Sequence, residues 1–265
     1  MQPNIPELID EAYSRPAAEK PRRYIGASGI GAKCDAELAW SLRGFPNAPI
    51  PPKLQRIFFA GHRIEDWVIS DLIKAGLHVM EHDPLTGKQW AFNDFGGHIS
   101  GHADGLVEDD DREVLLLEIK SMNERKWREF EKKGVQYSHP HYYAQVQFMM
   151  GLGNIEVCMF VAYNKNTSDY HAEYIDFDVF YYEGLKDRAE RILRGEGTRV
   201  ATDQSDWRCK GCFKRTVCWD EVAVLPQCTY CIHAVPQRDG TWDCNYSFGN
   251  VCDKYAQFNP GYRDD

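Results

Sequence analysis

A carboxylate and a lysine stand two residues apart at the end of an apolar run. The run begins at Val114 and reads Val-Leu-Leu-Leu-Glu-Ile-Lys, so that it ends with Glu118 and Lys120. Because the side chains of a strand alternate between two faces, Glu118 and Lys120 project from the same face. Both faces also carry aliphatic residues, as in a buried strand. A carboxylate and an ammonium group are costly to bury unless they pair or bind a metal ion.

A second carboxylate, Asp104, lies upstream in Gly101-His102-Ala103-Asp104-Gly105. Its flanking glycines allow close approach of a ligand or of another backbone. Asp104, Glu118 and the backbone carbonyl of Ile119 would form an oxygen-rich site suited to Mg²⁺ or Mn²⁺. Such an ion lowers the pKa of bound water and polarises a phosphodiester, while Lys120 could orient the water or stabilise charge on the phosphate. The pattern therefore predicts metal-dependent hydrolysis.

Two further residues extend this constellation. Glu65 falls in line with the apolar stripe of an expected helix, so it needs a partner, and a metal ion would serve. An ordinary ion pair at the edge of the stripe is the alternative. Gln145 could hydrogen-bond the attacking water or a phosphate, and a surface glutamine is the alternative there.

Nine cysteines are many for a chain whose start lacks the features of a signal peptide. In a reducing compartment, closely spaced cysteines indicate metal ligation before disulfides. A complete tetrahedral zinc set with one Cys-x2-Cys knuckle is formed by Cys228, Cys231, Cys244 and Cys252. An earlier group of three cysteines consists of Cys209, Cys212 and Cys218. It lacks a fourth ligand, and the distant Cys34 is the remaining candidate. Cys158, in an apolar strand, is expected to be a buried small hydrophobe.

A rival grouping has two Cys-x2-Cys knuckles at zinc-ribbon spacing and uses Cys209, Cys212, Cys228 and Cys231. It would leave over Cys34, Cys218, Cys244 and Cys252. The first grouping is preferred because it leaves only Cys158 unused.

The elements that must position these residues form a mixed α/β core with a central sheet. Helices are expected over 28–43, 54–75, 123–133, 139–152 and 182–194, and strands over 98–107, 114–120, 155–164 and 170–179. Residues 1–23 are expected to form a loosely held arm. From about residue 202, periodicity fades and cysteines dominate, which places a domain boundary near residue 200.

The whole chain has 265 residues, enough for one substantial core with a small appendage. Its net charge of −9 argues mildly against a non-specific nucleic-acid binder, although a site built from carboxylates adds to that count. No stretch has the apolar length needed to cross a bilayer. We therefore expect a cytoplasmic protein with no membrane partner.

Taken in chain order, four segments resemble the motifs of PD-(D/E)XK nucleases: Glu65, the Gly-x-x-Asp-Gly around Asp104, Glu118-Ile119-Lys120-Ser121, and the segment Tyr142-Tyr143-Ala144-Gln145-Val146-Gln147. The likeness covers roughly residues 24–180 and is to the RecB-type branch and to phage exonucleases of the lambda exonuclease type. It implies a restriction-endonuclease-like core and hydrolysis of phosphodiester bonds. Asp104 and Glu118 would be metal ligands, Lys120 catalytic, and Glu65 and Gln145 supporting. Many RecB-type members place a tyrosine after the glutamine, whereas here the tyrosines precede it.

The distant Cys34 followed by Cys-x2-Cys-x5-Cys resembles the iron–sulfur nucleases, namely the CRISPR-associated exonucleases and the AddB-type helicase-nucleases. The resemblance implies a [4Fe–4S] cluster on Cys34, Cys209, Cys212 and Cys218, which would staple the N-terminal helix to the end of the nuclease core. Those proteins often have Pro-Arg after the first cysteine, where this chain has Asp35-Ala36.

These observations together predict a nuclease core over residues 1–200 and a cysteine-rich iron–sulfur or zinc module over residues 201–265, tied back to Cys34. The expected function is Mg²⁺- or Mn²⁺-dependent cleavage of DNA, by an exonuclease of recombination, repair or phage DNA processing in a bacterial cell or phage-infected host. A recombination or replication protein is a possible partner, and an oligomer is compatible with the family. The competing hypotheses are a non-catalytic DNA- or protein-binding module on a degraded nuclease fold, and a nuclease that carries only zinc.

Overall fold

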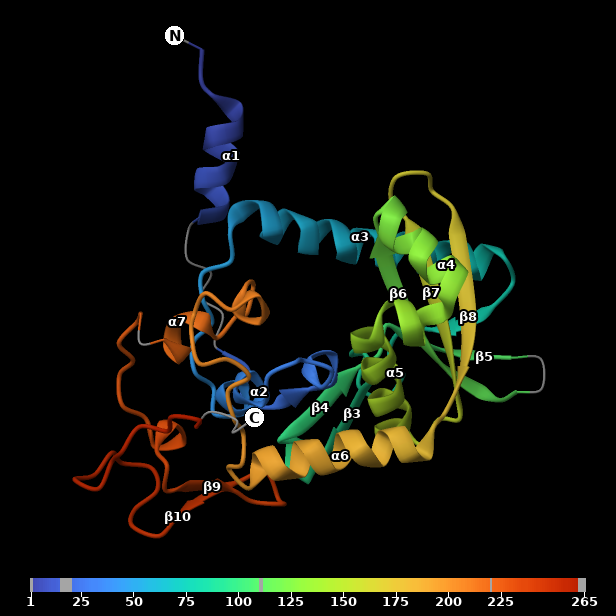
Figure 1. Cartoon of the computed structure of the whole chain (residues 1–265). Coiled ribbons are helices and arrows are strands. Elements are labelled where there is room, and N and C mark those ends of the chain that lie inside the picture. The colour runs from blue at the N-terminus through green and yellow to red at the C-terminus, as the bar shows by residue number, and fades with distance from the viewer. Residues whose placement is uncertain (1, 15–20, 110–111, 220, 262–265) are drawn as a thin grey trace.

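The computed structural model describes residues 2–14, 21–109, 112–219 and 221–261. Its centre is a five-stranded sheet with the order β2-β5-β6-β7-β8 (Figure 1). The strands are β2 (His78–Met80), β5 (Gly105–Glu108), β6 (Val114–Met122), β7 (Val157–Asn164) and β8 (Tyr170–Asp176). Only β6 and β7 pair in parallel, and the other neighbours are antiparallel. The prediction of a mixed α/β core with a central mixed sheet is therefore confirmed.

Helices cover both faces of this sheet. The helix α3 (Pro52–Lys74) lies on one face, where its Ile64 and Val68 share a cluster with Leu117 of β6. On the other face, Leu116 belongs to a second cluster with Val146 of α5. That side carries α4 (Glu124–Ser138) and α5 (Pro140–Gly153), and α6 (Val179–Leu193) packs on α5. The alternation of Leu116 and Leu117 between two clusters confirms that β6 is buried on both faces.

Local sequence explains where the long helices begin and end. Proline occupies the first turn of α3 and of α5, where its missing N–H costs nothing. The Asp178 side chain caps α6 by accepting from the N–H groups of Phe180 and Tyr181. The helix α5 ends at Asn154, which takes the left-handed conformation at φ 51°. These local signals are the reason that the expected helices over 54–75, 139–152 and 182–194 agree with the structure.

The single strand expected over 98–107 is wrong. The chain forms β4 (Ile99–His102) and β5 separately, and they belong to different sheets. β4 lies between β1 (Ile25–Gly26) and β3 (Ala91–Asp94) in a three-stranded sheet, whereas β5 pairs with β2 and β6. The break falls at Ala103 and Asp104, because the Ala103 N–H bonds to the Trp90 carbonyl and the Asp104 side chain turns to the edge of β6.

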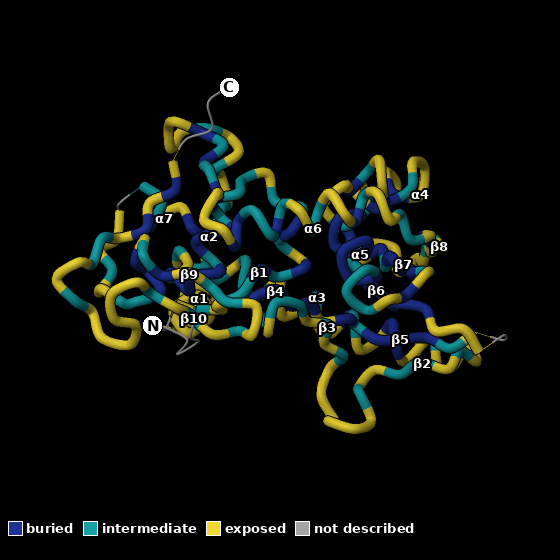
Figure 2. Tube along the Cα trace, turned by 90° about the horizontal axis from the view of Figure 1, so that it is seen from below, coloured by how far each residue is buried: buried dark blue, intermediate teal, exposed yellow. Residues whose placement is uncertain are grey.

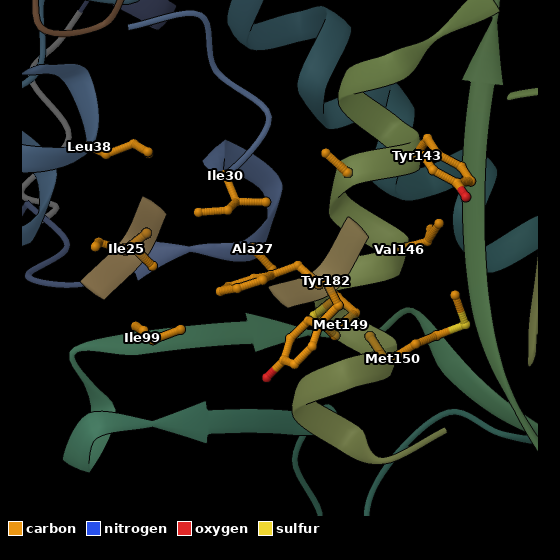
Figure 3. Packing of buried hydrophobic residues seen from close by; sticks show 14 of the residues in the cluster. Ile25, Ala27, Ile30, Leu38, Ile99, Tyr143, Val146, Met149, Met150 and Tyr182 are labelled. Carbon is orange, nitrogen blue, oxygen red and sulfur yellow. The ribbon is translucent and has the colours of Figure 1, made fainter. Parts of the chain in front are cut away.

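Two expectations for the N-terminal region also need correction. The segment expected to be a loosely held arm contains an unexpected helix, α1 (Ile5–Ser14), which contacts α3 but has no buried residue. The helix expected over 28–43 begins later, as α2 (Asp35–Leu42), after a short turn η1 (Ala27–Gly29). Gly31 lies between them against α5: a Cβ there would stand 2.9 Å from the Cα of His141. This segment thus packs closely on α5, and Figure 3 shows Ala27 and Ile30 in the same buried cluster as Val146 and Met149 of α5.

The C-terminal region consists of short elements joined by turns. They are η3 (Trp207–Cys209), α7 (Arg215–Cys218), η4 (Cys228–Tyr230), β9 (Ala234–Pro236) and β10 (Trp242–Cys244). The ring of Tyr230 stacks on Phe45 at 4.0 Å between centroids, and Phe258 meets Trp40 edge-on at 5.7 Å. Figure 2 shows this region as mostly exposed chain with a few buried segments next to α2. Its contacts with α2 place the cysteine-rich segment beside the N-terminal part of the fold.

Two smaller elements complete the description. The turn η2 (Phe95–Gly97) joins β3 to β4. The helix α4 is kinked at Gly134, at φ 71°, which is where the expected helix over 123–133 was to end. Among the described residues, none of the helices is both long enough and apolar enough to cross a membrane.

Candidate active site

Asp104 lies in the break between β4 and β5, at the edge of β6. Its Oδ2 accepts a hydrogen bond of 2.7 Å from the backbone N–H of Ile119. Since β5 pairs with β6 from Gly105 opposite Leu117, Asp104 stands beside the strand segment that carries Glu118 and Lys120. The structure therefore brings together the two acids and the lysine that the sequence indicates.

Glu118 is fully enclosed, and its side chain is 1% exposed. Its Oε1 accepts from the Lys120 ammonium and, at 2.7 Å, from the Gln145 amide of α5. Its Oε2 is buried and has no hydrogen-bond partner. Burial, and then the nearby Asp104 carboxylate, raise the pKa of Glu118 to about 7 against the opposing effect of Lys120. A buried carboxylate oxygen without a partner is costly, and a proton or a cation would relieve the cost.

Lys120 points from the same face of β6 as Glu118, as the period of the strand predicts. Its side chain is 21% exposed, whereas that of Glu118 is almost fully enclosed. Burial lowers the pKa of Lys120, but the carboxylates of Glu118 and Asp104 outweigh that effect and raise it overall. The lysine is therefore a permanent cation in this site.

Glu65 joins the site from α3. Its side chain is 26% exposed, and its Oε2 lies 3.7 Å from Nδ1 of His62. Burial raises the pKa of Glu65 to about 7, helped by the negative charges of Asp104 and Glu118 and opposed by Lys120. Glu65 therefore lies within the electrostatic influence of the other two acids, while its ion-pair contact is with His62 of the same helix.

Gln145 is placed in the site, but its contact differs from the predicted one. The residue is 8% exposed and its amide donates to Glu118, so it holds the carboxylate in place. Tyr142, one turn earlier on α5, lies under Lys120, with 5.3 Å between Nζ and the ring centroid. No role is predicted for Tyr142 from the sequence. Because Tyr142 lies three residues before Gln145, the two share one face of the helix, and this spacing could have indicated a role for Tyr142.

The side chains of the site supply oxygen donors of the chemical kind that divalent cations bind. Three carboxylates gather around one lysine, and one buried carboxylate oxygen has no partner. Oxygen donors of this kind suit Mg²⁺ or Mn²⁺. Over the described ranges, no three His, Cys, Asp or Glu side chains are arranged to hold a metal ion. The assignment of Glu65, Asp104, Glu118 and the Ile119 carbonyl as ligands stays a prediction.

The structure brings four cysteines to one cavity of about 110 Å³, lined by Cys34, Cys209, Cys212 and Cys218. Burial raises the pKa of Cys212 to about 12, with a further contribution from Glu37. The Cys218 thiol accepts a contact of 3.2 Å from the Arg199 guanidinium. Cys34, which the sequence could select only by elimination, thus lines the same cavity as the other three. Over the described residues these cysteines form no metal-holding group, so the iron–sulfur set stays a prediction.

The later cysteines are spread over the C-terminal turns. Cys228 and Cys231 flank the turn η4, Cys244 ends β10, and Cys252 lies in the loop that follows. Within the described part of the chain they do not form a metal-holding group, so the zinc set stays a prediction. Cys158 of β7 is fully buried in the core, as expected.

Comparisons with known proteins give distant similarities. No family model matches the chain, and no curated protein matches it. Among solved structures it is similar to LHK-Exo, an alkaline exonuclease from Laribacter hongkongensis, at 22% identity and a TM-score of 0.45 over 71% of this chain and 91% of that one. LHK-Exo in complex with dAMP matches over the same shares at 20% identity and a TM-score of 0.45. SSO0001 matches at 15% identity and a TM-score of 0.46, over 84% of this chain and 100% of that one. These similarities assign neither an activity nor site residues to this chain.

Proposed function

We propose that the protein is a divalent-metal-dependent nuclease that hydrolyses phosphodiester bonds in DNA, built on a restriction-endonuclease-like core. The observation that carries the proposal is the convergence of Glu65, Asp104 and Glu118 around Lys120, with Glu118 Oε2 buried and unpartnered. A fold gains no stability from three clustered acids, so their convergence points to a cation as the missing partner.

In this proposal Asp104, Glu118 and the Ile119 carbonyl hold Mg²⁺ or Mn²⁺, with Glu65 reaching the ion directly or through water. When bound, the ion would polarise the phosphodiester and make water a better nucleophile. Gln145 and Lys120 occupy Glu118 Oε1, which leaves Oε2 as the free donor of that carboxylate. The protein's own part is to hold these oxygens in a fixed arrangement.

Lys120 acts on the substrate side. It stays charged across the neutral pH range because two carboxylates stabilise its ammonium form. A fixed cation at the partly exposed edge of the site can orient the attacking water and stabilise the charge that grows on the phosphate. The Tyr142 ring below it restricts where the ammonium can lie.

DNA as substrate, and exonuclease action in recombination, repair or phage DNA processing, follow from the resemblance of the motifs to PD-(D/E)XK nucleases. A recombination or replication protein as partner and a homo-oligomer belong to the same proposal. The four cysteines around one cavity support a [4Fe–4S] cluster on Cys34, Cys209, Cys212 and Cys218. Zinc on Cys228, Cys231, Cys244 and Cys252 completes the proposed set of cofactors.

The test is to incubate purified protein with end-labelled single- and double-stranded DNA and Mn²⁺ or Mg²⁺, beside Lys120→Ala and Asp104→Ala. We expect cleavage that needs the added ion and that both substitutions abolish. The exposed Lys88, in the loop between β2 and β3, gives the control Lys88→Ala, which should cleave normally. Cleavage by both site variants would refute the site. DNA binding without cleavage by any form would favour the binding module.

The cofactors are tested by iron and zinc analysis of protein purified without oxygen. A [4Fe–4S] protein is brown with broad visible absorption, whereas a protein with zinc alone is colourless. We expect iron to be lost in Cys34→Ser and zinc to be retained. Zinc without iron would support the zinc-only alternative, and loss of zinc in Cys218→Ser would refute the grouping of the cysteines.

A further inference from the structure

A cavity of about 350 Å³ lies beside the candidate active site and takes no part in the chemistry described so far. It is lined by residues of the N-terminal half of α3 and the end of β6, and by the residue that follows β7. Its polar and small lining residues are Lys53, Arg56, Ala60, Gly61, Ser121 and Lys165.

The cavity adjoins the site on two sides. Ile64, which precedes Glu65 on α3, lines it, and so does Ser121, which follows Lys120 on β6. Lys165 follows β7, and its N–H bonds to the Met122 carbonyl at 2.9 Å. Because β6 and β7 are parallel, their carboxyl ends meet at one edge of the sheet, which is where ligands of α/β sheets commonly bind.

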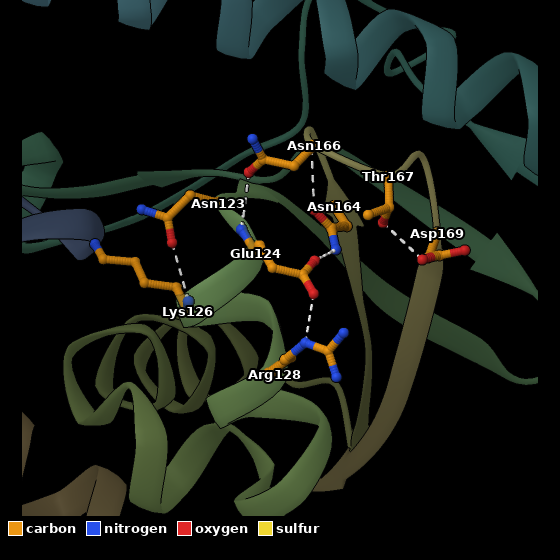
Figure 4. Close-up of polar contacts among 8 residues, drawn as sticks. All are labelled: Asn123, Glu124, Lys126, Arg128, Asn164, Asn166, Thr167 and Asp169. Atoms are coloured by element: carbon orange, nitrogen blue, oxygen red, sulfur yellow. Dashed lines mark hydrogen bonds and ion pairs between the residues drawn. The ribbon is translucent and has the colours of Figure 1, made fainter.

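The loop that carries Lys165 is fixed by hydrogen bonds. The Glu124 N–H donates to Asn166 Oδ1 at 2.9 Å, and the Asn166 N–H donates to Asn164 Oδ1 at 3.0 Å (Figure 4). Asn164 in turn bonds to the Glu124 carboxylate. The start of α4 therefore holds this loop, so that Lys165 is presented from an ordered backbone.

The charge of the lining is uniformly positive. Lys53, Arg56 and Lys165 line the cavity and no acidic side chain does. In the part of the chain that the structure describes, Lys53 and Lys165 have no ion-pair partner. Arg56 pairs with Asp10 of α1 at 2.6 Å, and both side chains are partly exposed. Three cations around one hollow repel each other, and an anionic ligand would remove that repulsion.

Gly61 gives a second, independent indication. Glycine in the middle of a helix is unfavourable compared with alanine, so its presence in α3 needs a reason. Packing supplies none, because a Cβ at Gly61 would meet nothing within 4 Å. Gly61 lies one turn before Glu65 and lines the cavity. A bare helix surface at that point allows a ligand to approach the backbone closely.

We infer that this cavity is a phosphate-binding subsite for the nucleic-acid strand, next to the bond that the active site would cleave. The inference rests on the proposed nuclease function. Lys53 and Lys165 bind backbone phosphate, Arg56 contributes when the phosphate displaces Asp10, and Gly61 leaves room for the sugar–phosphate chain. Ile57 and Ile64 give the cavity an apolar floor for the sugar.

The test measures how tightly a short fluorescent single-stranded oligonucleotide binds to the Lys120→Ala protein as salt is raised. Adding Lys53→Ala and Lys165→Ala should weaken binding about tenfold at low salt and reduce the slope of log affinity against log salt by about 0.7 per lysine. Adding Gly61→Leu, which fills the cavity without changing charge, should also weaken binding. Adding Asp10→Asn, which releases Arg56, should tighten it. Lys88→Ala is the matched control and should leave both the affinity and the slope unchanged.

Cleavage by the same variants with Lys120 intact separates this inference from the proposed function. A higher KM in Lys53→Ala/Lys165→Ala, with kcat little changed, supports the subsite. Cleavage with unchanged KM, salt slope and response to Gly61→Leu refutes the subsite and leaves the nuclease standing. Binding that depends on these residues in a protein that never cleaves supports the subsite and refutes the nuclease.

Discussion

At the scale of single residues, Glu118 determines what the site can do. Glu118 lies on β6 and faces α5. Its Oε1 accepts hydrogen bonds from Lys120 and Gln145, whereas its Oε2 has no partner. Its pKa near 7 means that, without a cation, the carboxylate holds a proton over part of the neutral range. A bound cation would displace that proton and make metal binding tighter as the pH rises.

Replacing Lys120 by alanine should lower kcat by about 10²–10³ with a smaller change in KM. The reason is that a fixed charge close to the reacting phosphate stabilises the transition state more than the ground state. Steady-state cleavage of labelled DNA measures the effect, and thermal unfolding shows whether the variant is folded. A folded variant with unchanged kcat would contradict the role given to Lys120.

Gln145→Leu should lower activity about tenfold without unfolding the protein. The amide holds Glu118 Oε1 at 2.7 Å, so its loss frees the carboxylate to rotate. Because Gln145 acts through Glu118, the metal concentration at half-maximal activity should rise, whereas a purely structural role would move only the unfolding temperature. Gln145→Glu, which adds a fourth acid, should instead lower the metal concentration at half-maximal activity.

His139 makes the stability depend on pH. It is buried, and burial together with Lys126 lowers its pKa below the ordinary value of 6.5. Below about pH 6.5 the unfolded chain takes up a proton that the folded state resists, so the unfolded state binds more protons and stability falls as the pH falls. Glu65 and Glu118, whose pKa values are raised to about 7, act in the opposite sense over this pH range. The contribution of His139 is therefore measured as the difference in urea unfolding between the wild type and His139→Asn from about pH 7 to pH 5. The stability of His139→Asn relative to the wild type should rise as the pH falls, and an unchanged difference would contradict the role given to His139.

At the scale of elements, the sequence predicts the helices and strands whose ends and apolar periodicity are determined by neighbouring residues. The helices α3, α5 and α6 agree because proline, aspartate and asparagine mark their ends and apolar periodicity marks their bodies. The division of the segment 98–107 into β4 and β5 could not be predicted, because it depends on distant partners. Ile99 pairs with Ile25, whereas Gly105 pairs with Leu117 in the other sheet.

The same distinction holds for the candidate site. Strand alternation was enough to place Glu118 and Lys120 on one face. The hydrogen bond from Gln145 to Glu118 depends on how α5 packs on the sheet, and no local sequence pattern predicts that packing. The gathering of Cys34 with the later cysteines likewise depends on the return of the C-terminal segment to α2.

Two glycines, one in α3 and one in β4, should respond in opposite ways to alanine. Gly61→Ala should stabilise the protein by about 0.5–1 kcal/mol, because alanine is the better helix former and no atom obstructs the methyl group. Gly101→Ala in β4 should destabilise it, because its Cβ would lie 2.0 Å from the Met149 sulfur. Urea unfolding of both variants measures the contrast, and destabilisation by Gly61→Ala would show that its backbone has a structural role.

At the scale of the whole molecule, the C-terminal segment is tied to the core through Arg43. This arginine, at the end of α2, is 5% exposed and donates to three backbone carbonyls, those of Thr229, Cys231 and Ala234. Its guanidinium also lies 4.0 Å from the ring centroid of Phe258. One side chain therefore organises the turn that carries Cys228 and Cys231.

Replacing Arg43 by methionine should free the C-terminal segment while the central sheet stays folded. Methionine fills much of the volume but leaves three buried carbonyls without a donor, at about 1–3 kcal/mol each. Hydrogen exchange should rise over the described residues after 221 and remain slow in β6 and β7, because the sheet has its own two apolar clusters. Arg63→Met, which removes an exposed arginine, should change neither region. Equal acceleration in β6 would mean that the segment and the sheet unfold together, and that Arg43 stabilises the whole molecule rather than its C-terminal part.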